Sequence, residues 1–336
     1  MKRLLFLTAL LYSVMSLSAQ QRPQYTQYLA NSYLLNPAIS GIENYTDVKI
    51  GYRQQWAGLQ DAPKTSFISA HWALGDEYLW PNALSFEGAG NDPRSRSYTQ
   101  NYTASPAHHG IGIIAVSDKA GQLSNIGFNV SYAYHLQLNY SLNLSFGVAG
   151  GFNRIGININ ALLLENPLDP ALSNAANARL YPDLSIGTWL YGASFFTGLS
   201  VQQVLPQKMS FSADERYNTG KQVAHIFLNS GYKFYLSEDL NVTPSLLFKY
   251  VDNLPLSMDI NAKMGFRDRM WLGAGYRKRD ALIVMAGFNI NHLLNFTYSY
   301  DFTASALNQV SRGSHEVVLG LLLNNVYKVA CPQRLW

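Results

Sequence analysis

The sequence has few charged residues, one cysteine and no long hydrophobic run beyond its first twenty residues. Only 14% of its 336 residues are charged, against about 25% in a typical soluble domain. The single Cys331 excludes an internal disulfide framework and a CxxC-type zinc or redox site. Without apolar runs of about eighteen residues, a bundle of transmembrane helices is excluded too. Aromatic residues, 13% of the chain, occur throughout it and argue against disorder.

The first nineteen residues are ordered like a secretory signal peptide. A basic start at residues 1–3 precedes an apolar run from Leu4 to Val14 and small residues ending at Ala19. The run is too short to span a bilayer, which needs about 20 apolar residues. We expect cleavage after Ala19, which removes two basic residues and lowers the formal net charge from +4 to +2. No Lys/Arg cluster is present, so nucleic-acid binding has no support.

The rest of the chain alternates between apolar and small polar residues, which is the pattern of β-strands. Most of these runs are about ten residues long, the length that a tilted strand needs to cross a bilayer. An even number of strands, fourteen, is predicted at 46–56, 65–74, 111–117, 125–136, 140–154, 183–192, 194–203, 223–236, 240–251, 256–266, 270–278, 281–290, 294–302 and 315–324.

Alternation also fits a soluble β-sandwich, but the polar face distinguishes the two folds. It consists of Gly, Ser, Asn and Ala with few charges, which suits an enclosed lumen better than bulk water. A charge facing mid-bilayer lipid costs up to about 2–4 kcal/mol, and eight strand charges fall on the polar face. We therefore predict an all-β fold, a transmembrane antiparallel β-barrel of about 14 strands. The charges expected in the lumen are Lys49, Arg53, Lys233, Lys249, Asp259, Lys263, Arg277 and Asp301.

Two side-chain predictions follow from this assignment. A lumenal Arg53 needs a buried partner, and the carboxylates of Asp259 or Asp301 are suitable. Val130 should face lipid and Ser131 the lumen, so arginine should be tolerated better at Ser131 than at Val130.

Loop lengths give the organisation of the chain. We predict a signal peptide at 1–19, a periplasmic N-terminal segment at 20–45, an outer-membrane barrel at 46–324 and a C-terminal tail at 325–336. Short turns fall on the periplasmic side, and the long connections 155–182, 204–222 and 303–314 fall on the outer side. One long connection, 75–109, would be periplasmic. It is either an insertion with a docking role or contains a further hairpin, and its low hydrophobicity favours the insertion.

No catalytic chemistry, cofactor or metal site is predicted. The glycine-rich run 110–115 lies in a strand with no helix after it, so it does not bind a dinucleotide. His108 and His109 are adjacent and diverge, which argues against a metal pair. Ser131 and His135 lie about 13 Å apart along one strand, too far for a hydrolase pair. The protein is not expected to be an enzyme.

Several motifs resemble those of the PorP/SprF family of outer-membrane proteins in the Bacteroidetes type IX secretion system. The most specific are 27–29 with 35–41 (LNPAISG), and 52–58 (YRQQWAG) with 62–65 and 69–71. Weaker matches are 118–121, 236–240 with 244–245, and the tail with Cys331, Pro332 and Trp336. The resemblance covers essentially the whole mature chain, and the 75–109 insertion departs from it.

The resemblance implies a barrel that serves secretion or gliding motility, through export or surface attachment of specific proteins. Implied partners are outer-membrane lipid and either periplasmic ring lipoproteins, a large adhesin with a type B C-terminal domain, or both. A passive porin or a hydrophobic-ligand channel is the alternative. Two roles stay open for the motif residues, an architectural one and, for segment 25–41, contact with a partner. The candidate residues are Asn36, Pro37, Ala38, Gly41, Arg53, Gln54, Trp56, Gly58, Pro63 and Lys64.

Overall fold

The computed structural model describes residues 25–43, 45–75, 103–159, 178–209, 220–237, 239–252, 254–267 and 269–325. The predicted signal peptide, most of the predicted insertion and the tail beyond residue 325 lie outside these ranges. Among the described residues, no helix is long and apolar enough to cross a membrane.

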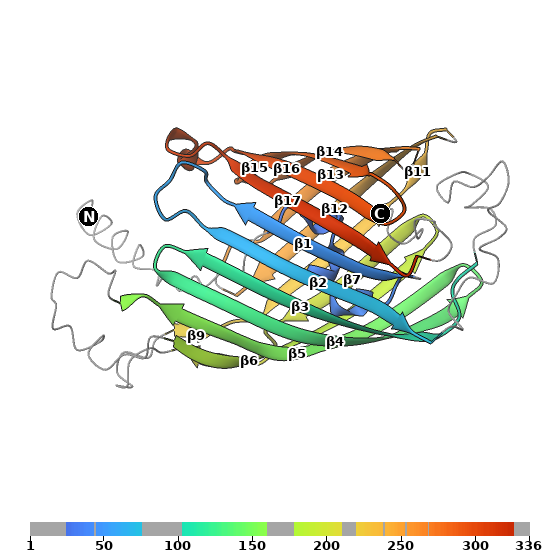
Figure 1. The fold of residues 1–336 in the computed structure, drawn as a ribbon, viewed down its shortest axis with the longest axis horizontal. Helices are drawn as coiled ribbons and strands as arrows, with labels where there is room; N and C mark the ends of the chain where they lie inside the picture. The colour runs from blue at the N-terminus through green and yellow to red at the C-terminus, as the bar shows by residue number, and fades with distance from the viewer. Residues whose placement is uncertain are drawn as a thin grey trace, which may run out of the picture.

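The described strands form a closed antiparallel barrel of 14 strands (Figure 1). Neighbours in sequence pair with each other, β1 pairs with β17, and β10 pairs with both β7 and β12. Lys233 interrupts one strand, so that β10 and β11 count as one. The barrel strands are β1 (Thr46–Gln54), β2 (Lys64–Leu74), β3 (His108–Ala120), β4 (Leu123–Asn139), β5 (Leu142–Ile157), β6 (Ala178–Gly192), β7 (Phe195–Gln202), β10 (His225–Tyr232), β11 (Phe234–Tyr235), β12 (Leu240–Val251), β13 (Ser257–Phe266), β14 (Met270–Arg277), β15 (Ala281–Asn289), β16 (Leu294–Thr303) and β17 (Ser314–Leu323).

The two ends of the barrel differ in their connections. At one end, which we call the turn end, strands β4–β5, β6–β7, β11–β12, β13–β14 and β15–β16 are joined by four residues or fewer. The opposite end, the loop end, carries the long connections between β5 and β6, between β7 and β10 and between β16 and β17, together with short ones at 121–122 and 278–280. The β7–β10 connection contains the small hairpin of β8 (Gln207–Met209) and β9 (Gly220–Gln222), which was not predicted. The predicted short turns and the three predicted long connections 155–182, 204–222 and 303–314 thus lie at opposite ends, and the long β2–β3 connection lies at the turn end.

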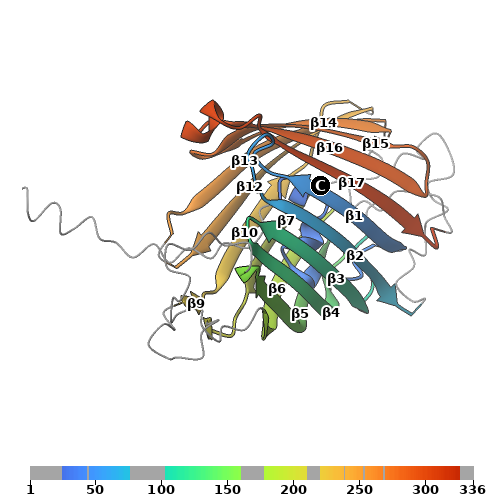
Figure 2. The ribbon, with the colours of Figure 1, turned by 60° about the vertical axis from the view of Figure 1, so that its left-hand side comes forward.

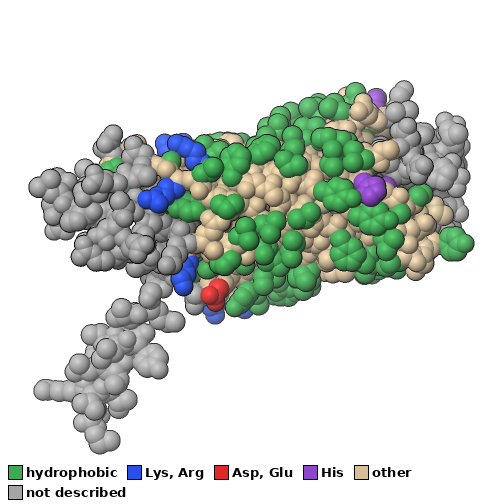
Figure 3. Space-filling view, turned by 90° about the horizontal axis from the view of Figure 1, so that it is seen from below, with side chains coloured by type: hydrophobic (Ala, Val, Ile, Leu, Met, Phe, Trp, Pro, Cys, Tyr) green, Lys and Arg blue, Asp and Glu red, His purple; other side chains and the backbone are tan. Residues whose placement is uncertain are grey.

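Alternation places apolar side chains outside and small polar ones inside, because successive residues of a strand point to opposite faces. Val130 is 50% exposed, whereas Ser131 is 2% exposed. A wide band of hydrophobic side chains covers the outer wall, with lysine and arginine gathered toward one end (Figure 3). Seven of the eight predicted lumenal charges are buried, and Lys249 lines an internal cavity. This outer wall is suited to lipid.

The N-terminal segment does not lie outside the barrel. Residues 25–43 run through the lumen as three short 3-10 helices, η1 (Gln27–Leu29), η2 (Ser32–Leu34) and η3 (Pro37–Ile39) (Figure 2). All but three of these residues are buried. The predicted periplasmic placement is thus wrong for residues 25–43. We call this segment the plug.

The plug is held inside because it is rich in leucine and tyrosine and carries only one charged residue, Glu43. Its apolar side chains form three clusters with inward-facing residues of strands on different sides of the barrel. Tyr28 and Leu35, for example, pack with Phe227, Ile283 and Met285. The core of the molecule therefore lies between the plug and the inner wall, and burial of this area stabilises the plug in place.

Candidate functional site

The plug begins near the loop end in a network of buried charges. The backbone N–H of Thr26 donates to Glu316 Oε2 (2.8 Å), and its hydroxyl donates to Asp301 Oδ2 (2.7 Å). Arg53 on β1 pairs with Asp301 (2.8 Å) and with Glu316 (3.0 Å), and also donates to the Thr26 hydroxyl (2.7 Å). Arg53 and the two carboxylates are at most 2% exposed. The predicted partner Asp301 is therefore confirmed, and Glu316 is a second one.

A second arginine completes this network. Arg277 on β14 pairs with Asp259 (3.1 Å), Asp280 (3.3 Å) and Asp301 (3.4 Å). It also donates to the Thr26 hydroxyl at 3.3 Å. Asp259 thus pairs with Arg277 rather than with Arg53. We call Arg53, Arg277, Asp259, Asp301 and Glu316 the arginine network; it pairs buried charges that would otherwise be costly.

Tyrosines of the plug bind the inner wall with their hydroxyl groups. Tyr28 is hydrogen-bonded to Asn261 on β13, and Tyr33 to Ser131 on β4 (2.6 Å). Burial raises the pKa of Tyr33 to about 12. Burial, with the Asp259 carboxylate as a second cause, raises the pKa of Tyr28 well above its usual value. Both phenols therefore stay neutral and keep their hydrogen bonds.

The 35–41 motif packs directly against glycines of the wall. A Cβ atom on Gly147 (β5) would lie 2.3 Å from the backbone nitrogen of Ala38, and one on Gly110 (β3) 1.8 Å from the carbonyl oxygen of Ser40. Real Cβ atoms do not approach so closely, so only glycine permits this contact. Gly41 itself has φ of +77°, a conformation that glycine adopts readily.

Polar contacts hold the same motif. Asn36 caps η3 by accepting from the Ala38 N–H (3.0 Å), and it donates to the Thr188 carbonyl on β6 (2.9 Å). The hydroxyl of Ser145 on β5 donates to the Ala38 carbonyl (2.6 Å). The candidate residues Asn36, Pro37, Ala38 and Gly41 are all buried in the lumen.

Three buried histidines surround the end of the motif. His135 contacts the Ser40 carbonyl (2.8 Å), His108 contacts the Gly41 carbonyl (3.1 Å), and His71 accepts from the Gly41 N–H (3.3 Å). His109 faces outward to Tyr132, so the two adjacent histidines diverge as predicted.

Ser131 is also part of the plug contact. Its hydroxyl lies 2.7 Å from that of Ser40 and 2.6 Å from that of Tyr33. His135 instead contacts the hydroxyl of Tyr191 with its other ring nitrogen, so Ser131 and His135 share no hydrogen bond. The tolerance predicted for arginine at position 131 assumed an open lumen. In the structure an arginine there would collide with the plug, so this reason for tolerance no longer holds.

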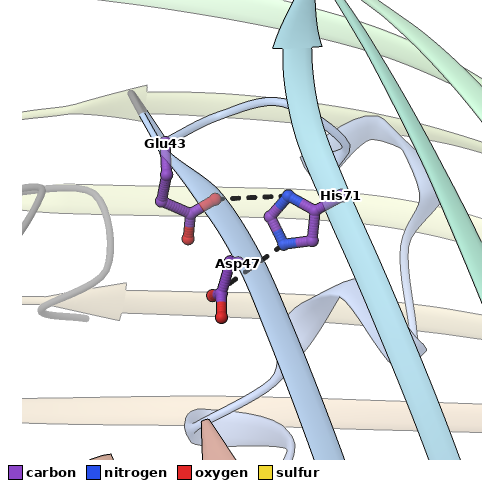
Figure 4. Close-up of side chains that lie close together, drawn as sticks. All are labelled: Glu43, Asp47 and His71. Carbon is purple, nitrogen blue, oxygen red and sulfur yellow. Dashed lines mark ion pairs between the residues drawn. The ribbon is translucent and has the colours of Figure 1, made fainter. Parts of the chain in front are cut away.

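Where the plug meets β1, Glu43, Asp47 and His71 form a buried group (Figure 4). Glu43 Oε2 lies 3.3 Å from His71 Nδ1, and Asp47 Oδ2 lies 4.0 Å from His71 Nε2. Their potential ligand atoms lie within 4.8 Å of one another. However, the Lys49 ammonium is paired with Asp47, and the carboxylates face different ring nitrogens. We therefore assign the group to anchoring the plug.

The remaining candidate residues lie at the loop end. They are half-buried or exposed and lie away from the plug motif: Gln54, Trp56, Gly58, Pro63 and Lys64. Their loop contacts the β16–β17 connection: Ala57 and the backbone of residues 312–313 exchange two hydrogen bonds of 2.7 Å. The structure thus separates the candidates into lumenal residues, which include Arg53, and a loop-end surface.

A cavity of about 80 Å³, partly open to solvent, lies beside the plug in the part of the lumen that the structure describes. It runs from Tyr33 and Gln202 at mid-barrel to Lys249 and Ser257 near the loop end. The plug and strands β10 and β12 supply apolar lining, and β4 and β5 supply amides and hydroxyls.

Comparison with known proteins identifies the chain. The profile described as type IX secretion system membrane protein PorP/SprF matches residues 17–321. The chain belongs to the PorP/SprF family. It is an integral outer-membrane protein and a membrane component of type IX secretion. A comparison with curated proteins gives no sequence match.

Solved structures resemble this PorP/SprF protein in fold. The toluene transporter TbuX of Ralstonia pickettii is 9% identical with a TM-score of 0.52, covering 87% of this chain and 93% of its own. Omp33 of Acinetobacter baumannii is 8% identical with a TM-score of 0.41, covering 84% and 100%. The toluene transporter TodX of P. putida is 9% identical with a TM-score of 0.47, covering 86% and 92%.

Several residues of this PorP/SprF lumen were not predicted from sequence. Thr26, Glu316 and the histidines at 71 and 135 all contact the plug or its network. The only inward signal was the alternation of strand 65–74, which places His71 on the same face as Thr65 and Ser69; the run 315–324 is apolar on both faces and gives none for Glu316. The missing information was that the N-terminal segment occupies the lumen, which would have given those side chains a partner.

Proposed function

We propose that this PorP/SprF barrel is a closed docking component of type IX secretion, which supports export or surface attachment of specific proteins. One observation supports this most: the plug is joined to the wall by hydrogen bonds from Thr26 to buried charged groups, by glycine contacts and by further hydrogen bonds of the 35–41 motif. A lumen held shut in this way is unsuited to passive flow of solutes. The chain offers surfaces for partners instead.

The short turns of outer-membrane barrels face the periplasm, so the turn end is the face for periplasmic ring lipoproteins. The loop end, with Trp56, Gly58 and Lys64, is the face for an exported adhesin with a type B C-terminal domain. An affinity purification from outer membranes, followed by mass spectrometry, distinguishes these two partners.

A deletion strain tests the proposal directly. We expect it to lose export or surface display of particular proteins while the permeability of the outer membrane to small solutes stays unchanged. Complementation with the wild-type gene should restore display. Normal export and display of all cargo in the deletion strain would overturn the proposal.

The second candidate is a hydrophobic-ligand channel. The fold shared with a toluene transporter and the partly apolar cavity favour it. Uptake of radiolabelled toluene by liposomes containing the pure protein measures it. Saturable uptake by the wild-type barrel, above that of empty liposomes, would favour the channel over the docking component.

A further inference from the structure

We propose that the outer wall at the loop end binds the phosphate group of an outer-leaflet lipid of the lipid A type. This inference is independent of the proposed docking role, because it concerns the lipid-facing side chains of the barrel strands. The outward residues at the loop ends of β2, β3, β4 and β5 carry the argument. Figure 3 shows lysine and arginine side chains gathered at this end of the wall.

Two lysines lie directly opposite each other on the outer wall. Lys64 at the start of β2 pairs with Lys119 near the end of β3, and both side chains are exposed. They alternate with inward residues, so they share the outer face with Ile68 and Ile113. Like charges directly opposite each other on antiparallel strands are destabilising. The pair is therefore suited to an anion bound between the two ammonium groups.

No carboxylate among the described residues supplies this anion. Asp118 is next to Lys119 but lies on the inner face, where it accepts from the Thr65 hydroxyl (2.6 Å). Asp61 is exposed in the loop between β1 and β2 and forms no ion pair with either lysine. Within the described part of the chain, the side chains of Lys64 and Lys119 have no polar partner at all. The anion must come from outside the protein.

Further donors of the kind that bind phosphate surround the two lysines. Ser124 on β4 is opposite Lys119, and Ser66 is opposite Ser117 in the next outward row of the wall. Arg154 on β5 is exposed and lies in that same row, two strands or about 10 Å from Ser117. Lysine, arginine and serine side chains all donate to phosphate oxygens. We call these residues the basic patch: Lys64, Lys119, Arg154, Ser66, Ser117 and Ser124.

The basic patch lies at the height of a lipid head group. The next row toward the turn end is apolar and exposed, with Ile68, Phe128 and Phe152. Along β4, the outward Tyr134 follows Ser124 by ten residues, which is about 25 Å along the axis of a barrel whose strands tilt by about 40°. The apolar band of outer-membrane barrels has this height. The patch and Tyr134 therefore mark the two membrane interfaces.

The orientation of the barrel selects the lipid. Long loops of outer-membrane barrels face the cell exterior, so the basic patch lies in the outer leaflet. Lipid A of that leaflet carries phosphate on its sugars and acyl chains beneath them. Its phosphate fits between the lysines while its chains cover the apolar row below, which a soluble anion or a peptide in the aqueous phase does not reach. Lys64 thus joins the loop-end surface to the lipid-facing wall.

Titration of the purified barrel in detergent micelles with monophosphoryl lipid A tests the basic patch. The variant Lys64→Gln/Lys119→Gln is compared with Arg267→Gln/Arg269→Gln, which removes two exposed cations at the turn end. Each basic residue near a membrane surface contributes about fivefold to binding. We expect binding to weaken about thirtyfold in the first variant and to stay unchanged in the second. No loss in the first variant, or an equal loss in both, would overturn the inference.

Two further probes distinguish the source of the phosphate. Lipid A without its phosphate should bind the wild-type barrel about as weakly as monophosphoryl lipid A binds the lysine variant. Inorganic phosphate at the concentration of the lipid should not displace it, because phosphate alone gains no contact with the apolar row. Equal binding of the two lipids, or displacement by inorganic phosphate, would refute a lipid phosphate site.

Thermal unfolding adds a readout that a purely structural role of the lysines would not give. Without lipid, Lys64→Gln/Lys119→Gln should be at least as stable as the wild type, because it removes two opposed like charges. Monophosphoryl lipid A should then raise the unfolding temperature of the wild type more than that of the variant. An equal rise in both would contradict the proposal.

A second variant covers the case in which the lysine variant does not assemble. Ser66→Ala/Ser117→Ala keeps both lysines and removes two hydroxyl donors. It should weaken the binding of monophosphoryl lipid A by about fivefold or more, since a hydrogen bond to a charged group is lost. Wild-type affinity in this variant would refute the basic patch as a phosphate site.

Discussion

The start of the plug and its 35–41 motif are held by different kinds of interaction. At the loop end, Thr26 forms hydrogen bonds with buried charged side chains, which lie on β1, β14, β16 and β17 and pair with one another. Further along, the 35–41 motif packs against glycines of the wall. It also forms hydrogen bonds with uncharged serine and histidine side chains. Burying a charged group without a partner destabilises the folded state, and so does adding a larger side chain to a closely packed site. The start of the plug is therefore sensitive to loss of one partner, and the motif to added volume.

The difference also separates two tasks. The arginine network ties strands that are distant in sequence and fixes where the plug begins. The glycine contacts leave no space between the motif and β3 or β5, so they seal the lumen along this part of the wall. The following substitutions test each region in turn.

The largest effect is expected at the arginine network. Arg53→Met leaves the Asp301 and Glu316 carboxylates buried with Arg277 as the remaining cation, and breaking a buried pair in this way costs about 3–5 kcal/mol. The free energy of unfolding, measured by urea titration of the barrel in detergent micelles, should fall accordingly.

Arg267→Met is the matched control for this change. It removes the ion pair with Asp239 at 3.0 Å, which lies exposed at the turn end, so the unfolding midpoint should not move. The double variant Arg53→Met/Glu316→Leu should recover much of the loss, since it removes charges of both signs. A midpoint for Arg53→Met equal to that of the control would show that the network is not needed for stability.

A smaller loss of stability is expected from adding volume at the motif. In Gly147→Val the new Cβ would lie 2.3 Å from Ala38 N and 2.5 Å from Pro37 C, both backbone atoms. Overpacking costs about 1–3 kcal/mol, and the motif should move away from the wall. Ion conductance in planar bilayers should then rise above that of the wild type.

Gly150→Val, three residues along the same strand, is the control. A Cβ there meets nothing within 4 Å, so stability and conductance should stay at wild-type values. Equal behaviour of the two variants would mean that the motif does not close the lumen.

The fourteen strands were predictable because the side chains of each strand alternate between lipid and lumen. The lipid face must be apolar, so the alternation appears within each short stretch of sequence. The same rule predicted that Arg53 points inward and gave Asp259 or Asp301 as its partner. The structure selects Asp301 and adds Glu316, which the sequence did not indicate. The location of the plug was not predictable in this way. Residues 25–41 have no strand pattern, and their placement depends on glycines such as Gly110 and Gly147, whose role appears only when the backbones of distant segments meet.

The smallest effect is expected from Asn36→Ala, and it distinguishes the two roles left open for the motif. The substitution removes the cap of η3, worth about 0.5–2 kcal/mol, and the hydrogen bond to Thr188. Asn36→Ser keeps a capping oxygen but cannot reach β6. Hydrogen exchange at the Ala38 amide should therefore accelerate in Asn36→Ala and much less in Asn36→Ser, if Asn36 acts through the local turn. Equal acceleration in both would assign its role to the bond with the wall. Unchanged exchange together with lost cargo display would instead favour a direct contact with a partner.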